Sequence, residues 1–128
     1  ASMKGVMRER GGALLFMSSV AGSRGQSGMA AYSAAKAAID GMVRSLACEF
    51  APRAIRVNAI AAGAVTTEMH HQLLMGMTEA AQLSYESKHL LGFGTPADIA
   101  GVAVFLLSDA ARWVTGATWL VDGGYTVR

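Results

Sequence analysis

The sequence is poor in cysteine and in charged residues, and it has no long apolar run. A single cysteine, Cys48, excludes an internal disulfide and fits a reducing cytoplasm. Charged residues make up 16% of the chain and its net charge is +2, which argues against a nucleic-acid-binding surface. No apolar run reaches membrane-spanning length, and the first five residues do not resemble a signal peptide. These absences favour a cytoplasmic protein with no nucleic-acid or membrane partner.

Apolar residues are abundant, at 52% of the 128 residues. This length suits one domain, so we expect residues 1–128 to form a single unit. The apolar fraction exceeds what so small a protein needs for its own core. We therefore expect part of its surface to pack against another surface, as in a homo-oligomer.

Strand-like and helix-like patterns alternate along the chain. Apolar runs predict strands at residues 13–18, 55–61 and 117–121. Helical patterns cover residues 2–10, 29–51, 69–91 (as one or two helices) and 95–108. Strands that alternate with helices indicate parallel crossovers, so we predict an α/β fold with three parallel strands and flanking helices.

Three side chains of complementary chemistry lie where the first strand joins the long helix. Tyr32 and Lys36 are four residues apart, so they share one helix face, and Ser19 ends the preceding strand. A free tyrosine is a poor base at neutral pH, and a nearby cation favours its phenolate form. A serine hydroxyl can hold a carbonyl or alcohol oxygen against the phenol. This set is suited to moving a proton to or from an oxygen.

Other interpretations of the same residues remain open. Tyr32 and Lys36 also fit a surface pair of a helix, and Ser19 also fits a simple strand end. Ser18 has the same chemistry as Ser19. Only the spacing to Tyr32 selects Ser19 as the functional hydroxyl.

The segment 69–91 contains two histidines and several methionines. His70 and His71 lack acidic or cysteine partners at metal-ligand spacing, so we expect a solvated helix and no metal site. The methionines fit an adaptable substrate pocket or a loosely packed lid equally well.

The motif Tyr32-Ser-Ala-Ala-Lys36, with Ser19 thirteen residues before the tyrosine, resembles the active-site motif of the short-chain dehydrogenase/reductase family. Four further segments match that family in the same order, at residues 18–22, 56–60, 62–67 and 116–124. Together they cover nearly the whole chain. The sequence is most similar to the 3-oxoacyl-carrier-protein reductase type.

The resemblance implies a Rossmann-like, doubly wound fold and a nicotinamide cofactor, NAD or NADP. It implies oxidoreduction between a carbonyl and a secondary alcohol of a small molecule, with Tyr32 as the acid/base. Ser19 would orient the substrate oxygen, and Lys36 would tune Tyr32 and hold the ribose hydroxyls. It also implies that the long helix packs against its counterpart in a second subunit. The implied cofactor-binding residues are Tyr32, Lys36, Gly63, Val65 and Thr67, although Thr67 also fits a simple helix cap.

The family's phosphate-binding turn, TGxxxGxG, has no match among these residues, nor does its NNAG strand. The sequence therefore resembles the carboxy-terminal half of a subunit, with the amino-terminal dinucleotide-binding half missing and the first strand left as a sheet edge. Cofactor binding is then expected to be weak or absent, because the missing turn holds the pyrophosphate. One alternative is an inactive fragment with a packing or oligomerisation role. Another is an epimerase or dehydratase of the extended branch, which the short stretch after Lys36 disfavours.

Overall fold

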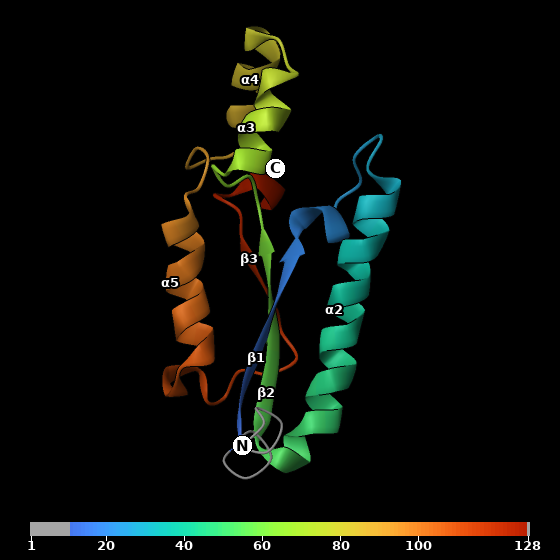
Figure 1. Ribbon diagram of the computed structural model, residues 1–128, viewed down its shortest axis with the longest axis vertical. Helices are drawn as coiled ribbons and strands as arrows, with labels where there is room; N and C mark the ends of the chain where they lie inside the picture. Colours follow the sequence, from blue (N-terminus) through green and yellow to red (C-terminus); the bar gives the residue numbers. More distant parts are fainter. Residues whose placement is uncertain (1–10, 128) are drawn as a thin grey trace.

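The computed structural model describes residues 11–127 as three strands and four helices, joined by short 3₁₀ turns (Figure 1). The strands are β1 (Gly12–Ser19), β2 (Ile55–Ala62) and β3 (Thr118–Val121). The helices are α2 (Ala30–Phe50), α3 (Glu68–Met75), α4 (Glu79–Glu86) and α5 (Pro96–Leu107). The predicted α/β pattern is confirmed, and segment 69–91 forms two helices. The helix predicted over residues 2–10 lies outside the described residues.

The three strands form one parallel sheet in the order β1-β2-β3. Ser19 of β1 is opposite Ala62 of β2, and Ala62 is opposite Val121 of β3. The strands therefore end level with one another, and the segments that follow them begin at the same edge of the sheet. We call this the carboxyl edge.

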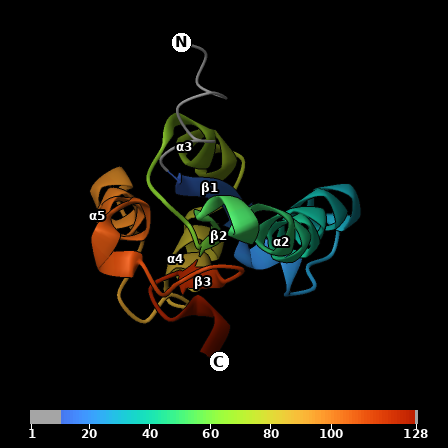
Figure 2. The same cartoon turned by 90° about the horizontal axis from the view of Figure 1, so that it is seen from below.

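Helices α2 and α5 cover opposite faces of the sheet (Figures 1 and 2). Each face has its own apolar cluster, which explains why the strands are almost continuously apolar. The α2 cluster contains Val43, Ala47, Val57 and Ala59, with Leu14 and Phe16 packed against it. The α5 cluster contains Ile60, Leu106 and Ala111, with Leu15 and Trp119 packed against it. Neighbouring residues of one strand therefore pack into the clusters on opposite faces of the sheet.

Two polar side chains, those of the half-buried Arg56 and the buried Asn58, fasten the connection between α5 and β3 onto β2. The guanidinium of Arg56 donates to the carbonyls of Leu106 (2.7 Å) and Ser108 (2.9 Å). Asn58 is 1% exposed; its Nδ2 donates to the Val114 carbonyl (2.9 Å) and its Oδ1 accepts from the Ala117 amide (3.2 Å). These bonds hold β3 in register with β2.

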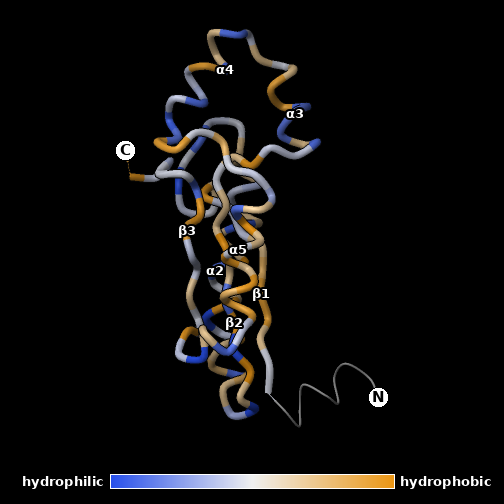
Figure 3. Tube along the Cα trace, turned by 90° about the vertical axis from the view of Figure 1, so that its left-hand side faces the viewer, coloured by the Kyte–Doolittle hydropathy of each residue, from blue (hydrophilic) through white to orange (hydrophobic). Residues whose placement is uncertain are grey.

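Strand β1 forms an edge of the sheet, because it pairs only with β2 in the part of the chain that the structure describes. Its residues are mainly apolar (Figure 3), and Met17 is 45% exposed. An apolar edge strand with unpaired backbone groups can pair with a strand of another chain. The sheet edge expected from the sequence is therefore present.

Candidate active site

The carboxyl edge brings together Ser19, Tyr32 and Lys36, as the sequence predicts. Ser19 ends β1, and α2 begins at Ala30, so Tyr32 lies in the first turn of that helix. The Lys36 Nζ donates to the Met17 carbonyl (3.0 Å) and lies 5.6 Å from the centre of the Tyr32 ring. Lys36 thus connects the end of the strand to the phenol.

The structure separates the roles of the two adjacent serines. Ser18 is buried, and its hydroxyl donates to the Lys36 carbonyl (3.2 Å), which fixes α2 on β1. The Ser19 hydroxyl is half-buried and accepts from the Ala21 amide (3.2 Å). Its own proton has no acceptor among residues 11–127, so it is free to donate to a substrate oxygen. The choice of Ser19 over Ser18, which rested on spacing alone, now has a structural reason.

This edge of the molecule is open. Tyr32 is 42% exposed, and its ring is accessible at the start of α2. The ammonium of Lys36 has three N–H donors, and within the described chain one of them is used on Met17. Two donors therefore remain for a bound molecule next to the phenol.

The loop after β2 also lies at this edge, and each of its three expected cofactor residues has a structural role. A Cβ on Gly63 would lie 2.7 Å from the Asp122 Cα, so only glycine allows this close approach. Val65 forms an isolated bridge with Gly94. The Thr67 hydroxyl caps α3 by accepting from the His70 amide (3.3 Å). A cofactor role for these residues remains a prediction.

Helices α3 and α4 lie beyond the carboxyl edge of the sheet (Figure 1). Burial raises the pKa of Tyr85 on α4, and the nearby phenols of Tyr125 and Tyr32 raise it further. The phenol of Tyr32 on α2 is thus one of the groups that act on Tyr85. Sequence reasoning missed Tyr85, because segment 69–91 has no pattern that distinguishes one aromatic residue.

The expectation of a solvated helix at His70 and His71 is wrong for His70. His70 is 7% exposed and packs edge-on against Phe93, with ring centres 4.6 Å apart, whereas His71 is exposed. No group of three metal-ligating side chains occurs in residues 11–127, and none of the helices there has the length and hydrophobicity to cross a membrane. His70 is therefore a packing residue of the segment beyond the sheet.

The chain end returns to the same region after β3. The carboxylate of Asp122 accepts from the Gly124 amide (3.0 Å) and from the amide (2.9 Å) and hydroxyl (2.7 Å) of Thr126. Burial opposes ionisation of Asp122, but these bonds and nearby His89 outweigh it and lower its pKa. The turn places Tyr125 beneath the guanidinium of Arg24, 4.4 Å from the ring centre.

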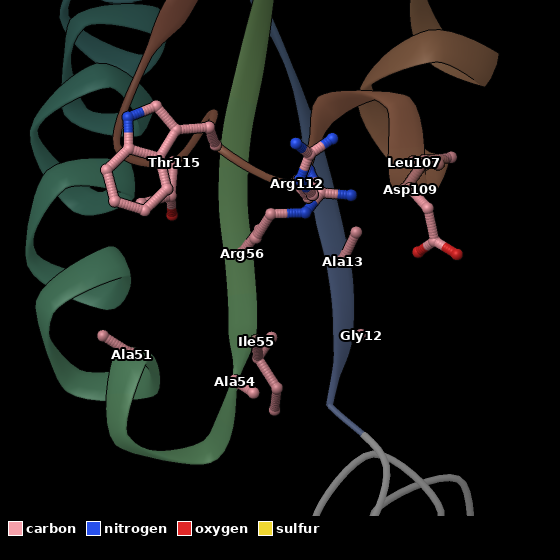
Figure 4. Close-up of a pocket in the computed structure, with 11 residues that line it drawn as sticks. Gly12, Ala13, Ala51, Ala54, Ile55, Arg56, Leu107, Asp109, Arg112 and Thr115 are labelled. Atoms are coloured by element: carbon pink, nitrogen blue, oxygen red, sulfur yellow. The ribbon is translucent and has the colours of Figure 1, made fainter.

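One cavity lies away from these residues. Its volume is about 620 Å³, and it opens at the amino-terminal ends of β1 and β2 (Figure 4). Its lining includes Gly12, Ile55, Arg56, Asp109, Arg112 and Thr115, and none of the predicted site residues. A second cavity of about 210 Å³ lies at the carboxyl edge, between Val65, Phe93 and Asp122. Of the predicted site residues, only Val65 lines this second cavity.

Comparison with known proteins identifies the family of this chain. Residues 1–126 match the family described as Enoyl-(Acyl carrier protein) reductase. The chain is 42% identical to 2-(S)-hydroxypropyl-CoM dehydrogenase 3 of Xanthobacter autotrophicus, covering 98% of this chain and 51% of that protein. It is 40% identical to the 3-oxoacyl-[acyl-carrier-protein] reductase FabG of Pseudomonas aeruginosa, covering 97% and 49%.

A solved structure of 4-hydroxyisoleucine dehydrogenase complexed with NADH matches with a TM-score of 0.84 and 33% identity, covering 91% of this chain and 47% of that one. The chain thus spans about half the length of the relatives that it matches. Its three parallel strands and flanking helices form part of a Rossmann-like fold. The chain belongs to the short-chain dehydrogenase/reductase family.

Proposed function

We propose that this protein is an NAD(P)-dependent oxidoreductase that interconverts a carbonyl and a secondary alcohol of a small molecule, in the manner of a 3-oxoacyl reductase. The observation that carries the proposal is the meeting of Ser19, Tyr32 and Lys36 at the carboxyl edge, with unused donors facing outward. Ligands of open α/β sheets bind at this edge. The family membership agrees with this chemistry.

The donor set fits the nicotinamide–ribose part of a dinucleotide. The two unused N–H donors of Lys36 suit the hydroxyls of a ribose, and the exposed phenol of Tyr32 stands beside them. The loop containing Gly63, Val65 and Thr67 borders the same edge. The nicotinamide, when bound, supplies or accepts the hydride.

The residues of this chain handle the proton and the oxygen. The Ser19 hydroxyl donates to the substrate oxygen and holds it against Tyr32, and the phenol gives its proton to that oxygen in the reductive direction. Lys36 fixes the helix end on β1 through the Met17 carbonyl and presents its charge to the phenol. In the oxidative direction Tyr32 takes the proton back.

Fluorescence titration with NADH and with NADPH tests the cofactor part of this proposal. We expect saturable but weak binding, because the phosphate-binding turn has no match among these residues. It is expected to be lost in Lys36→Met and retained in Lys88→Met, a control that removes an exposed lysine of the same charge. Tyr32→Phe is expected to keep the binding and to abolish any turnover of a 3-oxoacyl thioester. An absence of binding up to millimolar cofactor would contradict the proposal and leave a chain that acts through its interfaces.

We further propose that the protein forms a homo-oligomer through the exposed face of α2. This face contains Ala34, Ala38 and Met42, which is 39% exposed, and it also contains the exposed Cys48. Small side chains such as Ala34 and Ala38 suit close packing against a second copy, and the exposed Glu49 lies near the end of the same face. Sedimentation velocity is expected to show a dimer or larger species, and Met42→Glu is expected to shift it toward the monomer. A monomer at all concentrations contradicts this part.

A further inference from the structure

Five aromatic rings join α3, α4 and the chain end into one cluster, which we call the aromatic cluster. Its members are His70 of α3, Tyr85 of α4, His89 and Phe93 of the connection to α5, and Tyr125 of the last turn. Ring centres lie 4.6 Å apart for His70 and Phe93, 5.3 Å for Tyr85 and His89, and 4.5 Å for the stacked pair His89 and Tyr125. The packing of α3 and α4 on the rest of the molecule therefore depends on two histidines.

His70 is the cluster member with a buried ring nitrogen that lacks a hydrogen bond within the described residues. Its Nε2 is buried without a hydrogen-bond partner in the described part of the chain. A neutral ring nitrogen tolerates this position between Phe93 and Tyr85, but a buried cation there needs a partner. Protonation of His70 is thus incompatible with the packed cluster.

His89 has a different environment. Its Nε2 accepts from the Ala64 amide (3.4 Å), and its Nδ1 lies 3.2 Å from the Tyr85 carbonyl, which sets the tautomer with Nδ1 as donor. The carboxylate of Asp122 interacts with His89. An acidic side chain therefore neighbours His89, whereas the side chains that act on His70 are two other histidines.

The titratable groups that influence His70 come from its own helix and from the elements packed on it. His71 on α3 and His89 in the connection to α5 both oppose a positive charge on His70. Tyr85 contributes a neutral phenol from α4. On the far side of His89, Tyr125 carries the guanidinium of Arg24 over its ring.

We propose that His70 is a pH-sensitive latch: its neutral ring holds α3 and α4 against Phe93, His89 and Tyr125, and protonation releases the two helices. The latch concerns packing alone, so it stands or falls independently of the proposed function.

The direction of the pH effect follows from linkage. Burial lowers the pKa of His70 below its ordinary value of 6.5, and the charges of His89 and His71 lower it further. The released form therefore binds the proton more tightly than the packed form. The stabilisation that neutral His70 gives to the packing of α3 and α4 is complete above pH 6.5, and it is lost as the pH falls through the lowered pKa of His70.

Hydrogen exchange of the whole 128-residue chain tests the latch between about pH 8 and about pH 5, the range in which histidine changes charge. After correction for intrinsic rates, we expect exchange in α3 and α4 to rise several-fold at the acidic end, with β1 and β2 unchanged. His70→Phe keeps an aromatic ring against Phe93 and is expected to remove this pH dependence. His71→Gln, one position along the same helix and exposed, is expected to retain it.

Persistence of the pH dependence in His70→Phe, or its absence in the unmodified chain, overturns the proposal. NMR titration of the imidazole resonances gives a second measurement that needs no variant. A midpoint for His70 below 6.5 supports the latch, and a midpoint at or above 6.5 contradicts it.

Discussion

Replacement of Asn58 by leucine is expected to cost a large part of the stability of this chain. Asn58 is 1% exposed, and both ends of its amide are bonded to the segment that leads into β3. Leucine has a similar volume, so the change removes hydrogen bonds without leaving a large cavity. The Ala117 amide and the Val114 carbonyl then lose their partner in a dry environment.

The magnitude follows from the groups left unpaired. Each buried polar group without a partner costs about 1–3 kcal/mol. The Val114 carbonyl keeps a long contact from Arg56 (3.4 Å), so its cost lies at the lower end. We therefore expect Asn58→Leu to lower the free energy of unfolding by about 2–4 kcal/mol.

Urea denaturation followed by tryptophan fluorescence measures this loss, because Trp119 lies in β3 next to the affected segment. Gln72→Leu is the matched control: its amide is exposed and bonds Glu68 on the surface, so the expected change is within about 0.5 kcal/mol. A loss below about 1 kcal/mol for Asn58→Leu would show that these bonds do not hold β3 in place.

Four further substitutions test the carboxyl edge. Ser18→Ala is expected to cost about 1 kcal/mol of stability, because it removes the hydrogen bond to the Lys36 carbonyl. Ser19→Ala is expected to lower turnover with little loss of stability. Equal effects of the two variants on stability and on turnover would contradict the division of roles. Gly63→Ala forces the loop away from Asp122, so thermal melting is expected at a lower temperature. The hydrogen bonds to the Asp122 carboxylate lower its pKa, so the turn that they hold is stable above pH 3.8, the ordinary pKa of this group. As the pH falls through the lowered pKa, the amides of the turn are expected to lose their protection from hydrogen exchange. Asp122→Asn is expected to reduce this pH dependence.

The architecture was predictable from local pattern. Apolar runs buried on both faces, such as 55–61, and helices with start signals, such as Thr95 and Asp98, have their cause within a few residues. The pairing of Ser19 with Tyr32 and Lys36 was equally accessible, because strand end and helix start are close in sequence. Alternation of these elements then predicts a parallel sheet, and the expected place of a site is its carboxyl edge.

The parts that were not predictable depend on contacts between distant residues. Burial of His70 requires Phe93 and the segment around Tyr125, which lie 23 and 55 residues further along the chain. No sequence periodicity links residues this far apart, so the pattern of a histidine pair on a polar helix predicts exposure to solvent. The distinction between Ser18 and Ser19 also depends on which hydroxyl meets α2, a matter of strand orientation that spacing alone does not give.

An NMR titration of the isotope-labelled chain with NADH locates the cofactor on the molecule. If Ser19, Tyr32 and Lys36 form the reacting end of a dinucleotide site, amide shifts will move at the end of β1, in the first turns of α2 and in residues 63–67. Those shifts will disappear in Lys36→Met. Shifts confined to the cavity at the amino-terminal ends of the strands, around Arg56 and Arg112, would contradict the assignment of the site.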